Sequence, residues 1–291
     1  MQQRPCPTLG RPVSVLGFGG IVLSGRPQAD CDREVAAAVD QGFTYFDVAP
    51  QYGDAQERMG PALRPFRDRV VLNCKTLERG GPAARAQLDD SLKKLETDRF
   101  DVYQLHAVTT EEDVDRVLAP GGALEALEGA QRAGKCRALG FSAHGEDAAL
   151  RLIATGRFRT MLLPLNAVMF ERGVFGPRAL AAANAAGMTV YALKAMARGK
   201  ADPERGQGHP KCWYEVEDRA PIAELALRYT LGLPGVVAAL PPGQPELFRV
   251  AAAAATRAEG PALTTPLDAD EKARLLDAMA GSRPLFPAAA A

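Results

Sequence analysis

Short apolar runs alternate with longer amphipathic or alanine-rich stretches along almost the whole chain. Runs rich in β-branched and aromatic residues are typical of buried strands, and the stretches between them have the spacing of helices. The pattern predicts eight strands, at residues 13–19, 43–47, 69–75, 100–106, 136–142, 160–165, 188–194 and 235–240. It also predicts helices between them, for example at residues 31–42, 83–97 and 177–187. The last of these ends on Gly187, and glycine commonly ends a helix in the left-handed conformation.

The regular alternation of strands and helices predicts an α/β fold with a parallel sheet. Eight βα units in a chain of 291 residues match a closed (β/α)8 TIM barrel. An open doubly wound sheet usually carries the glycine signature GxGxxG after its first strand. Here that strand ends in Gly19 and Gly20 without the third glycine. No domain boundary is visible, so we expect one domain that spans residues 1–291.

Two segments interrupt the rhythm. Residues 198–220 form a long, charged loop after the seventh strand, where barrel enzymes place loops over the active site, and we expect a lid there. The tail after Pro261 is expected to form a helix at 269–279 and then an apolar strap, PLFP at 284–287, on the outside of the barrel. The alanine run 251–255 is expected to continue the last barrel helix.

Composition narrows the possible partners. Lys+Arg and Asp+Glu number 35 each and are interspersed, which argues against nucleic-acid binding. No uncharged run approaches the ~20 residues of a membrane span. Pro5, Pro7 and Pro12 interrupt any secretion signal, and the five cysteines form no CxxC pair. We therefore expect a cytoplasmic protein with reduced thiols and without a nucleic-acid, membrane or metal partner, and the oligomeric state is open.

Catalytic residues of a barrel lie at the carboxyl ends of its strands. The polar residues at the ends of the expected strands are Asp47, Lys75, His106, Ser142 and Lys194. Tyr52 follows in a turn marked by Pro50 and Gly53. Each residue alone has an ordinary structural explanation, such as a cap or a solvated strand end. Together, an Asp–Lys pair beside a tyrosine is expected to lower the phenol pKa, and a histidine can bind the same substrate oxygen.

The stretch GFTYFDVAPQYGDAQERMG at 42–60, with the residues above, resembles the aldo-keto reductase family. The resemblance extends from LGFGG at 16–20 to ALRYTLGLPGVVAALPPG at 226–243. It implies an NAD(P)-dependent oxidoreductase that transfers hydride between nicotinamide and the carbonyl of an aldehyde, ketone or sugar-like substrate. The partner is then a small-molecule carbonyl or alcohol. The implied catalytic residues are Asp47, Tyr52, Lys75 and His106.

In the implied mechanism Tyr52 is the general acid/base, Lys75, held by Asp47, tunes it, and His106 orients the carbonyl. The cofactor contacts expected from the resemblance are Gly19, Gly20, Asp47, Ser142, Asn166, Leu193, Lys194, Gly243 and Glu246.

The sequence departs from the family where the nicotinamide carboxamide is usually held. Ala143 replaces the usual asparagine, Leu162 the usual glutamine, and Leu193 the stacking aromatic residue. His144 has three open roles: a replacement contact to the cofactor, a substrate contact, or a surface position at the start of a helix.

The choice of dinucleotide depends on the segment after the eighth strand. Gln244 and Pro245 stand where NADP-preferring members place basic residues, and Glu246 would repel a 2′-phosphate. NAD(H) is therefore slightly favoured, and Arg249 is the group that would reverse this preference.

Two other functions stay open: an isomerase or lyase that uses the same four residues with an internally regenerated cofactor, and a non-enzymatic binding module. Trp213 and Tyr214 offer either a wall for a sugar or apolar ligand face or packing against the barrel rim.

Overall fold

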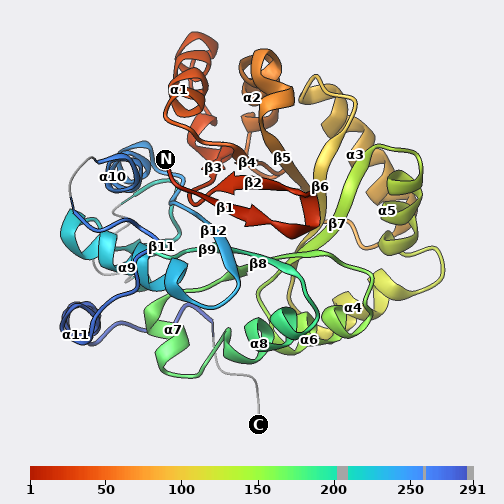
Figure 1. The fold of residues 1–291 in the computed structure, drawn as a ribbon. Coiled ribbons are helices and arrows are strands. Elements are labelled where there is room, and N and C mark those ends of the chain that lie inside the picture. The colour runs from red at the N-terminus through yellow and green to blue at the C-terminus, as the bar shows by residue number, and fades with distance from the viewer. Residues whose placement is uncertain (202–208, 258–259, 287–291) are drawn as a thin grey trace.

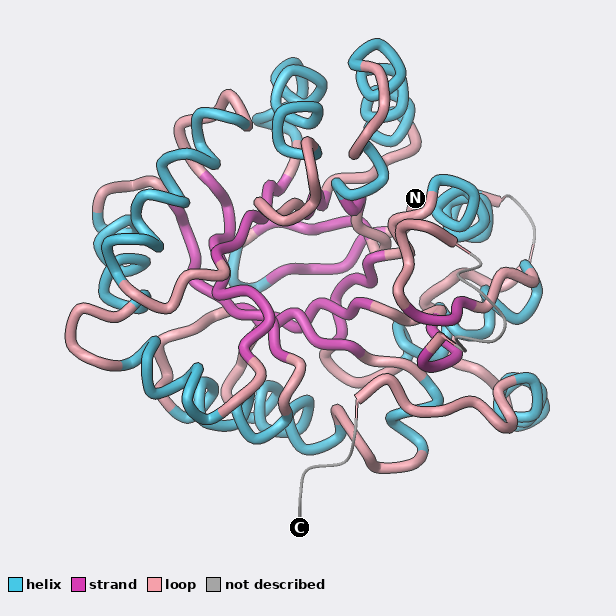
Figure 2. Tube along the Cα trace, turned by 180° about the vertical axis from the view of Figure 1, so that it is seen from behind, coloured by secondary structure: helices cyan, strands magenta, loops and turns pink. Residues whose placement is uncertain are grey.

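A closed parallel barrel forms the centre of the computed structural model, which describes residues 1–201, 209–257 and 260–286 (Figures 1 and 2). Its eight strands are paired in the order β12-β9-β8-β7-β6-β5-β4-β3. A parallel bridge between Leu16 and Ala239 closes the ring. The strands are β3 (Phe18–Gly19), β4 (Tyr45–Asp47), β5 (Val71–Thr76), β6 (Phe100–Val108), β7 (Cys136–Ala143), β8 (Thr160–Pro164), β9 (Thr189–Leu193) and β12 (Val236–Leu240).

Helices surround the barrel in Figures 1 and 2, as the βα rhythm predicts. They are α1 (Gln28–Asp40), α2 (Ala55–Leu63), α3 (Gly81–Lys94), α4 (Glu111–Leu118), α5 (Ala123–Arg132), α6 (Glu146–Ala154), α7 (Ala167–Glu171), α8 (Pro177–Ala185), α9 (Ala220–Gly232), α10 (Pro245–Thr256) and α11 (Ala269–Ala278). The alanine run lies in α10 and the tail helix is α11, so both predictions are confirmed. Gly187 has the expected positive φ of 64°.

The first expected strand is wrong in part. Residues 13–19 do not form one strand, because β2 (Arg11–Ser14) pairs antiparallel with β1 (Gln3–Cys6), whereas the part of the run from the Leu16 bridge through β3 pairs with barrel strands. Both halves of the run are buried, one in the hairpin and one in the barrel, and a continuous apolar pattern therefore hides the break. Gly17 lies between the Leu16 bridge and β3 and donates to the Ala239 carbonyl at 3.0 Å, and an added Cβ there would come within 2.5 Å of the Tyr45 ring.

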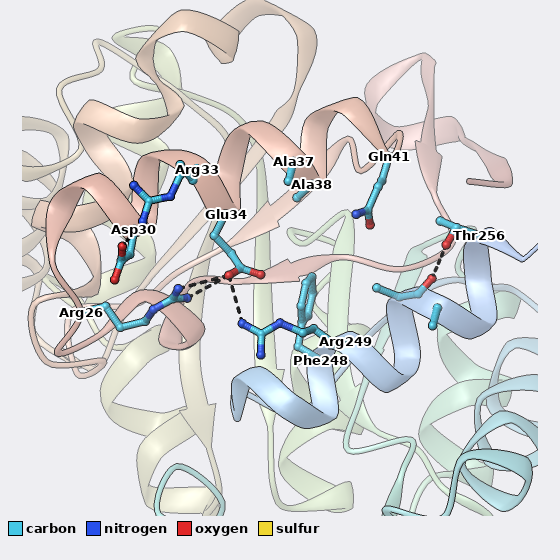
Figure 3. A pocket seen from close by; sticks show the side chains of 12 residues that line it. Arg26, Asp30, Arg33, Glu34, Ala37, Ala38, Gln41, Phe248, Arg249 and Thr256 are labelled. Atoms are coloured by element: carbon cyan, nitrogen blue, oxygen red, sulfur yellow. Dashed lines mark hydrogen bonds and ion pairs between the residues drawn. The ribbon is translucent and has the colours of Figure 1, made fainter.

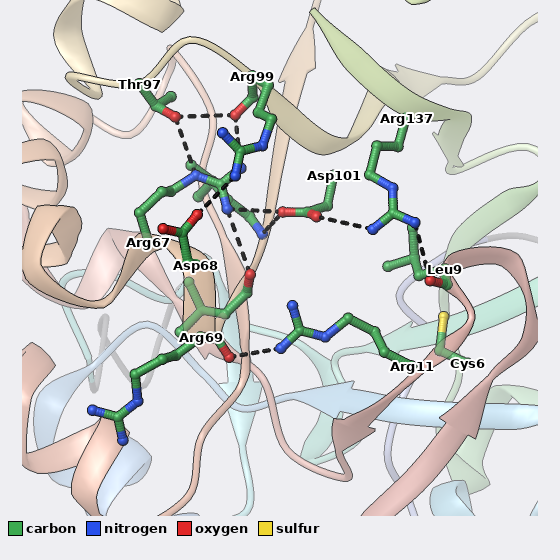
Figure 4. Close-up of polar contacts among 12 residues, drawn as sticks. Cys6, Leu9, Arg11, Arg67, Asp68, Arg69, Thr97, Arg99, Asp101 and Arg137 are labelled. Carbon is green, nitrogen blue, oxygen red and sulfur yellow. Dashed lines mark hydrogen bonds and ion pairs between the residues drawn. The ribbon is translucent and has the colours of Figure 1, made fainter. Parts of the chain in front are cut away.

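The β1–β2 hairpin covers the amino-terminal end of the barrel (Figure 1). Polar contacts at this end are drawn in Figure 4, where the buried Asp101 accepts a hydrogen bond from Arg67 at 3.0 Å and lies 3.9 Å from Arg137. Arg11 of the hairpin donates to the carbonyl of Arg69 at 2.8 Å. This end of the barrel is closed, so the carboxyl ends of the strands are left for ligands.

Aromatic rings fill the barrel interior. Tyr45 and Tyr191 stack with ring centroids 4.4 Å apart, and Cys6 of the hairpin lies 3.3 Å from the Tyr191 hydroxyl. The barrel is therefore a packed core rather than a pore. All five cysteines are buried and unpaired, in agreement with the prediction of reduced thiols. Within the described ranges, no helix combines the length and the apolar character that a membrane crossing needs.

The loop after β9 contains a second hairpin, β10 (Ala197–Lys200) paired with β11 (Tyr214–Val216). Arg205, Gly206 and Gly208 of the expected lid fall outside the described residues.

Candidate active site

The loop from β4 to α2 presents Tyr52 at the carboxyl-terminal end of the barrel. Gly53 has a φ of 59°, a left-handed conformation that favours glycine. The Asp54 carboxylate then accepts a hydrogen bond from the Gly25 amide at 2.7 Å and one from Arg58 at 2.9 Å. The first bond fixes the loop against the segment that follows β3, and the second joins it to α2.

A buried ion pair joins Asp47 at the end of β4 to Lys75 on β5. The same carboxylate oxygen also accepts hydrogen bonds from the amide of Asn73 and, at 3.4 Å, from the hydroxyl of Tyr45. Lys75 is 0% exposed and Asp47 2%. Burial of two charges is expensive unless each has partners, and these donors supply them for the carboxylate.

One cavity of about 350 Å³ at the carboxyl ends of the strands is lined by all four expected catalytic residues, Asp47, Tyr52, Lys75 and His106. Besides Asp47, the expected cofactor contacts that line it are Gly19, Ser142, Leu193, Lys194 and Gly243. Leu162, which stands in the place of the usual glutamine, lines it as well.

Three expected cofactor contacts are not among its lining residues. Gly20 is packed against Met59 and Val48, so that an added Cβ would lie 2.9 Å from each of these side chains. Asn166 caps α7, with its side-chain oxygen accepting from the Met169 amide at 3.0 Å. Glu246 lies at the start of α10, where its carboxylate accepts from the Gln244 side chain at 2.7 Å (Glu246 Oε2).

Burial raises the pKa of the Tyr52 hydroxyl, and the negative charge of Asp47 adds to this effect. The direction is opposite to the tuning predicted from sequence, because Asp47, which neutralises Lys75, itself faces the phenol. The pKa of His106 lies well below its ordinary value. Burial is the largest cause, and the positive charge of Lys75 is the next. At neutral pH Tyr52 is therefore a protonated phenol and His106 a neutral imidazole.

The strand end that carries His106 is distorted. The register of β6 against β7 shifts between Leu105 and Val108, and Ala107 has a φ of 50°. The hydroxyl of Ser142 accepts a hydrogen bond from the Ala107 amide at 2.8 Å, and Arg79 donates to the carbonyl of His106 at 3.0 Å. Bulges near active sites redirect side chains, and this one is held from both sides.

Sequence reasoning missed two residues that contact His106. Gln51, whose Oε1 lies 2.8 Å from His106 Nδ1, immediately precedes Tyr52 in the recognised motif. Its position there was the available signal. Arg79 follows β5 in a loop without a motif, and nothing in the sequence connects it to His106.

Lys194 at the end of β9 lies in a ring of aromatic side chains. Its Nζ is 5.2 Å from the Trp213 ring centroid, 5.4 Å from that of Phe286 and 6.0 Å from that of Tyr214. It also lies 3.3 Å from Nε2 of His144. Burial lowers the pKa of Lys194 to about 7, and burial followed by the charge of Lys194 lowers that of His144 to about 3.

The carboxyl-terminal strap therefore differs from its prediction. Phe286 stacks on His144 with centroids 4.7 Å apart, so the tail reaches the rim of this cavity instead of the outside of the barrel. His144 lines the cavity and is not a surface residue. Trp213 is both a cavity wall and packed at the rim, with 53% of its surface exposed.

Lys211 enters the cavity from the loop after β9. Its ammonium donates hydrogen bonds to the carbonyls of Ile21, Val22 and Ser24, at 3.1, 3.1 and 2.7 Å. The loop is thereby joined to the segment that follows β3.

The model of the aldo/keto reductase family matches residues 15–246. The chain belongs to this family. Aldo-keto reductase YhdN from Bacillus subtilis is 32% identical over 169 residues, which cover 53% of this chain and 49% of that protein. A 6-dehydroglucose reductase from Novosphingobium aromaticivorans is 29% identical over 180 residues, covering 54% and 57%. The chain thus spans about half the length of the curated relatives it matches.

Solved structures of other aldo-keto reductases share the fold. A Klebsiella pneumoniae aldo-keto reductase in complex with NADPH aligns with a TM-score of 0.70 and 23% identity, with 100% of each chain covered. An aldo-keto reductase from Bacillus halodurans aligns with a TM-score of 0.69 and 20% identity over 95% of this chain and 96% of that one. The predicted (β/α)8 barrel is confirmed.

Proposed function

We propose that the chain is an NAD(P)-dependent oxidoreductase that interconverts a small carbonyl compound and its alcohol, with Tyr52 as the proton donor. The observation that carries the proposal is the cavity in which Tyr52, His106 and the buried Asp47–Lys75 pair meet. Four residue types with complementary roles in carbonyl chemistry come from separate segments and converge at the functional end of a barrel.

The residues around the cavity fit a dinucleotide. Gly19 leaves its strand end open, since only one backbone atom lies as close as 4.0 Å to an added Cβ. The Ser142 hydroxyl can donate its proton to the carboxamide of the cofactor. Leu193 offers an apolar surface, and Lys211 supplies positive charge on the side of the cavity where Gly19 lies. We infer that these residues hold the cofactor. When bound, the dinucleotide supplies the hydride.

The protein residues manage the proton. A raised pKa keeps Tyr52 protonated at neutral pH, which suits a group that gives a proton to a carbonyl oxygen as it becomes an alkoxide. Neutral His106 can donate a hydrogen bond to the same oxygen when its proton is on Nε2. Lys75 provides positive charge next to the phenolate that forms when Tyr52 loses its proton, and Asp47 keeps the Lys75 ammonium in place.

We also propose a preference for NAD(H) over NADP(H). A groove of about 510 Å³ lies between α1 and α10 (Figure 3). There, Glu34 binds Arg26 at 3.2 Å and Arg249 at 3.6 Å. The pKa of Lys211 is lowered by burial and then by the charge of Arg26, so this groove lies within electrostatic range of the catalytic cavity. Glu34 offsets the arginines that would otherwise attract a 2′-phosphate.

The test is oxidation of NADH or NADPH by purified protein in the presence of aldehydes, ketones and aldoses, followed by absorbance. Turnover with at least one carbonyl class is expected, and Tyr52→Phe should lower it by about 10²-fold or more. Cofactor binding without turnover across the panel would overturn the proposal.

A further inference from the structure

Among the described residues, those that line the catalytic cavity carry more positive than negative charge. The charged ones are Asp47, Lys75, Lys194 and Lys211. Asp47 neutralises Lys75, and Lys211 is held by three backbone carbonyls. Among the described residues, no carboxylate forms an ion pair with Lys194, which is only 8% exposed. A buried ammonium without a counter-ion is expensive, and such groups occur at functional sites.

Lys194 is also held in an unfavourable backbone conformation. Its φ of 62° lies in the left-handed region, where a residue with a Cβ is strained. The turn that follows is closed by a hydrogen bond from the Ala197 amide to the Lys194 carbonyl at 3.0 Å. Strain together with an unpaired buried charge indicates that the ammonium is kept at this place for a ligand.

The described residues around the Lys194 ammonium leave it free to bind an anion. Trp213, Tyr214 and Phe286 contact it with ring faces, which stabilise a cation without using its N–H donors. His144 takes one N–H at 3.3 Å. Two donors of the three on an ammonium are then available to the cavity.

We propose that Lys194 determines substrate specificity, and that the preferred substrate is an aldehyde or ketone that carries a carboxylate. This proposal rests on the proposed function, because it assigns the substrate class of the same site. Lys194, His106 and Tyr52 line the same cavity of about 350 Å³. Burial, and then the charges of Lys75, His144 and Lys194, lower the pKa of His106. A substrate with its carbonyl at Tyr52 and His106 therefore has Lys194 within electrostatic reach.

A carboxylate fits better than a phosphate. A phosphate dianion is usually bound by several donors, ideally a bidentate arginine. No arginine is found among the described lining residues, and the second unpaired lysine, Lys211, is engaged by the segment after β3. A single ammonium with two free donors matches a carboxylate.

The first experiment compares acid and ester pairs as substrates of the cofactor-loaded protein at pH 6.5. Suitable pairs are 4-carboxybenzaldehyde and its methyl ester, and succinic semialdehyde and methyl 4-oxobutanoate. We expect kcat/KM to favour each acid at least tenfold. Lys194→Met should reduce that ratio to threefold or less, whereas Lys194→Arg should retain most of it. Equal kcat/KM for acid and ester in the wild type would overturn the proposal.

The matched control is Lys272→Met. Lys272 also places its ammonium 6.0 Å from a ring centroid, that of Tyr229, but it lies on the surface and pairs with Glu171 at 2.8 Å. The acid-to-ester ratio of this variant should equal that of the wild type. A preference that survives Lys194→Met in folded protein would also reject the proposal.

A second measurement needs neither turnover nor a variant. Benzoate should stabilise the wild-type protein against heat more than benzamide at equal concentration. The titratable groups around Lys194 are His144, Tyr214 and, in the same cavity, His106. Because the pKa of Lys194 is about 7, its amine is mostly neutral at pH 8, so calorimetry in two buffers at that pH should show proton uptake with benzoate as the ammonium re-forms. If no carbonyl compound is reduced but benzoate binds in this way, the oxidoreductase proposal fails and the anion site stands. If neither probe binds, or the two bind equally, the anion site fails.

Discussion

The side-chain oxygen Oε1 of Gln51 lies 2.8 Å from Nδ1 of His106. Because the lowered pKa keeps His106 neutral, its ring carries one proton, and the partner of Nδ1 decides which nitrogen holds it. When Gln51 presents its oxygen, the proton is on Nδ1 and Nε2 only accepts. A half-turn of the amide presents NH2 instead and moves the proton to Nε2, where it can be donated to a carbonyl oxygen.

The first prediction concerns this tautomer. A glutamate at position 51 can only accept from Nδ1, so Gln51→Glu should fix the proton there and lower kcat by about tenfold or more. Gln51→Met, which leaves Nδ1 without a partner, should have a smaller effect. Ring nitrogen chemical shifts report the tautomer independently of turnover. Wild-type kcat in Gln51→Glu would show that Nε2 of His106 does not act as a donor.

The second prediction concerns the proton donor. Tyr52→Phe should lower kcat by about 10²-fold or more, the scale of a positioned proton transfer, and leave dinucleotide affinity almost unchanged. Because the pKa of Tyr52 is raised, its hydroxyl should stay protonated and cause no loss of activity between pH 6 and pH 9. Single-turnover kinetics and a cofactor titration measure the two effects separately. More than half of wild-type turnover in the Phe variant would exclude Tyr52 from this role.

The convergence of Asp47, Lys75 and His106 was predictable from sequence for a geometric reason. Parallel strands of a barrel end at one rim, so polar residues that end apolar runs must meet there. Seven of the eight expected strands correspond to β4 through β9 and β12. The pattern failed at residues 13–19, since apolar periodicity reports burial and does not tell which sheet buries the residues.

The environment of Lys194 was not predictable in the same way. Phe286 reaches it from the far end of the sequence, and this contact depends on how the tail crosses the rim rather than on any local pattern. The role of His144 was ambiguous for the same reason. From the sequence it is a residue near the start of a helix, and it lines a cavity wall where the tail stacks on it. The direction of the Tyr52 pKa shift also required the structure, since it depends on which charges face the phenol.

The third prediction concerns stability. The pKa of Lys194 is about 7 in the folded protein and ~10.4 in an unfolded chain. Below pH 7 both states hold the proton, and the folded state bears the whole penalty of the buried charge. Between pH 7 and pH 10 the unfolded state binds more protons, so stability from this group rises with pH.

Lys194→Met removes the penalty and should be more stable than the wild type at pH 6, by about 1–4 kcal/mol. The difference in the free energy of unfolding between the two proteins should become smaller toward pH 10. Urea unfolding at pH 6, 8 and 10 measures it, with Lys272→Met as the control that shows no such trend. A wild-type protein that is the more stable of the two at pH 6 would mean that Lys194 has a counter-ion in solution.

The last prediction concerns the dinucleotide. A ligand that binds only the folded protein stabilises it by RT ln(1 + [L]/Kd), so the thermal shift at equal concentration ranks NAD against NADP. The wild type should shift more with NAD, because Glu34 occupies both Arg26 and Arg249 and adds negative charge to the groove between α1 and α10. Glu34→Gln frees both guanidinium groups and should move the preference toward NADP, by roughly tenfold in relative affinity if one charge-assisted contact forms. Glu57→Gln, which removes a surface carboxylate paired with Lys94, is the matched control and should leave the ranking unchanged. A larger shift with NADP in the wild type would contradict the assigned preference, and an unchanged ranking in Glu34→Gln would show that this groove does not receive the ribose end of the cofactor.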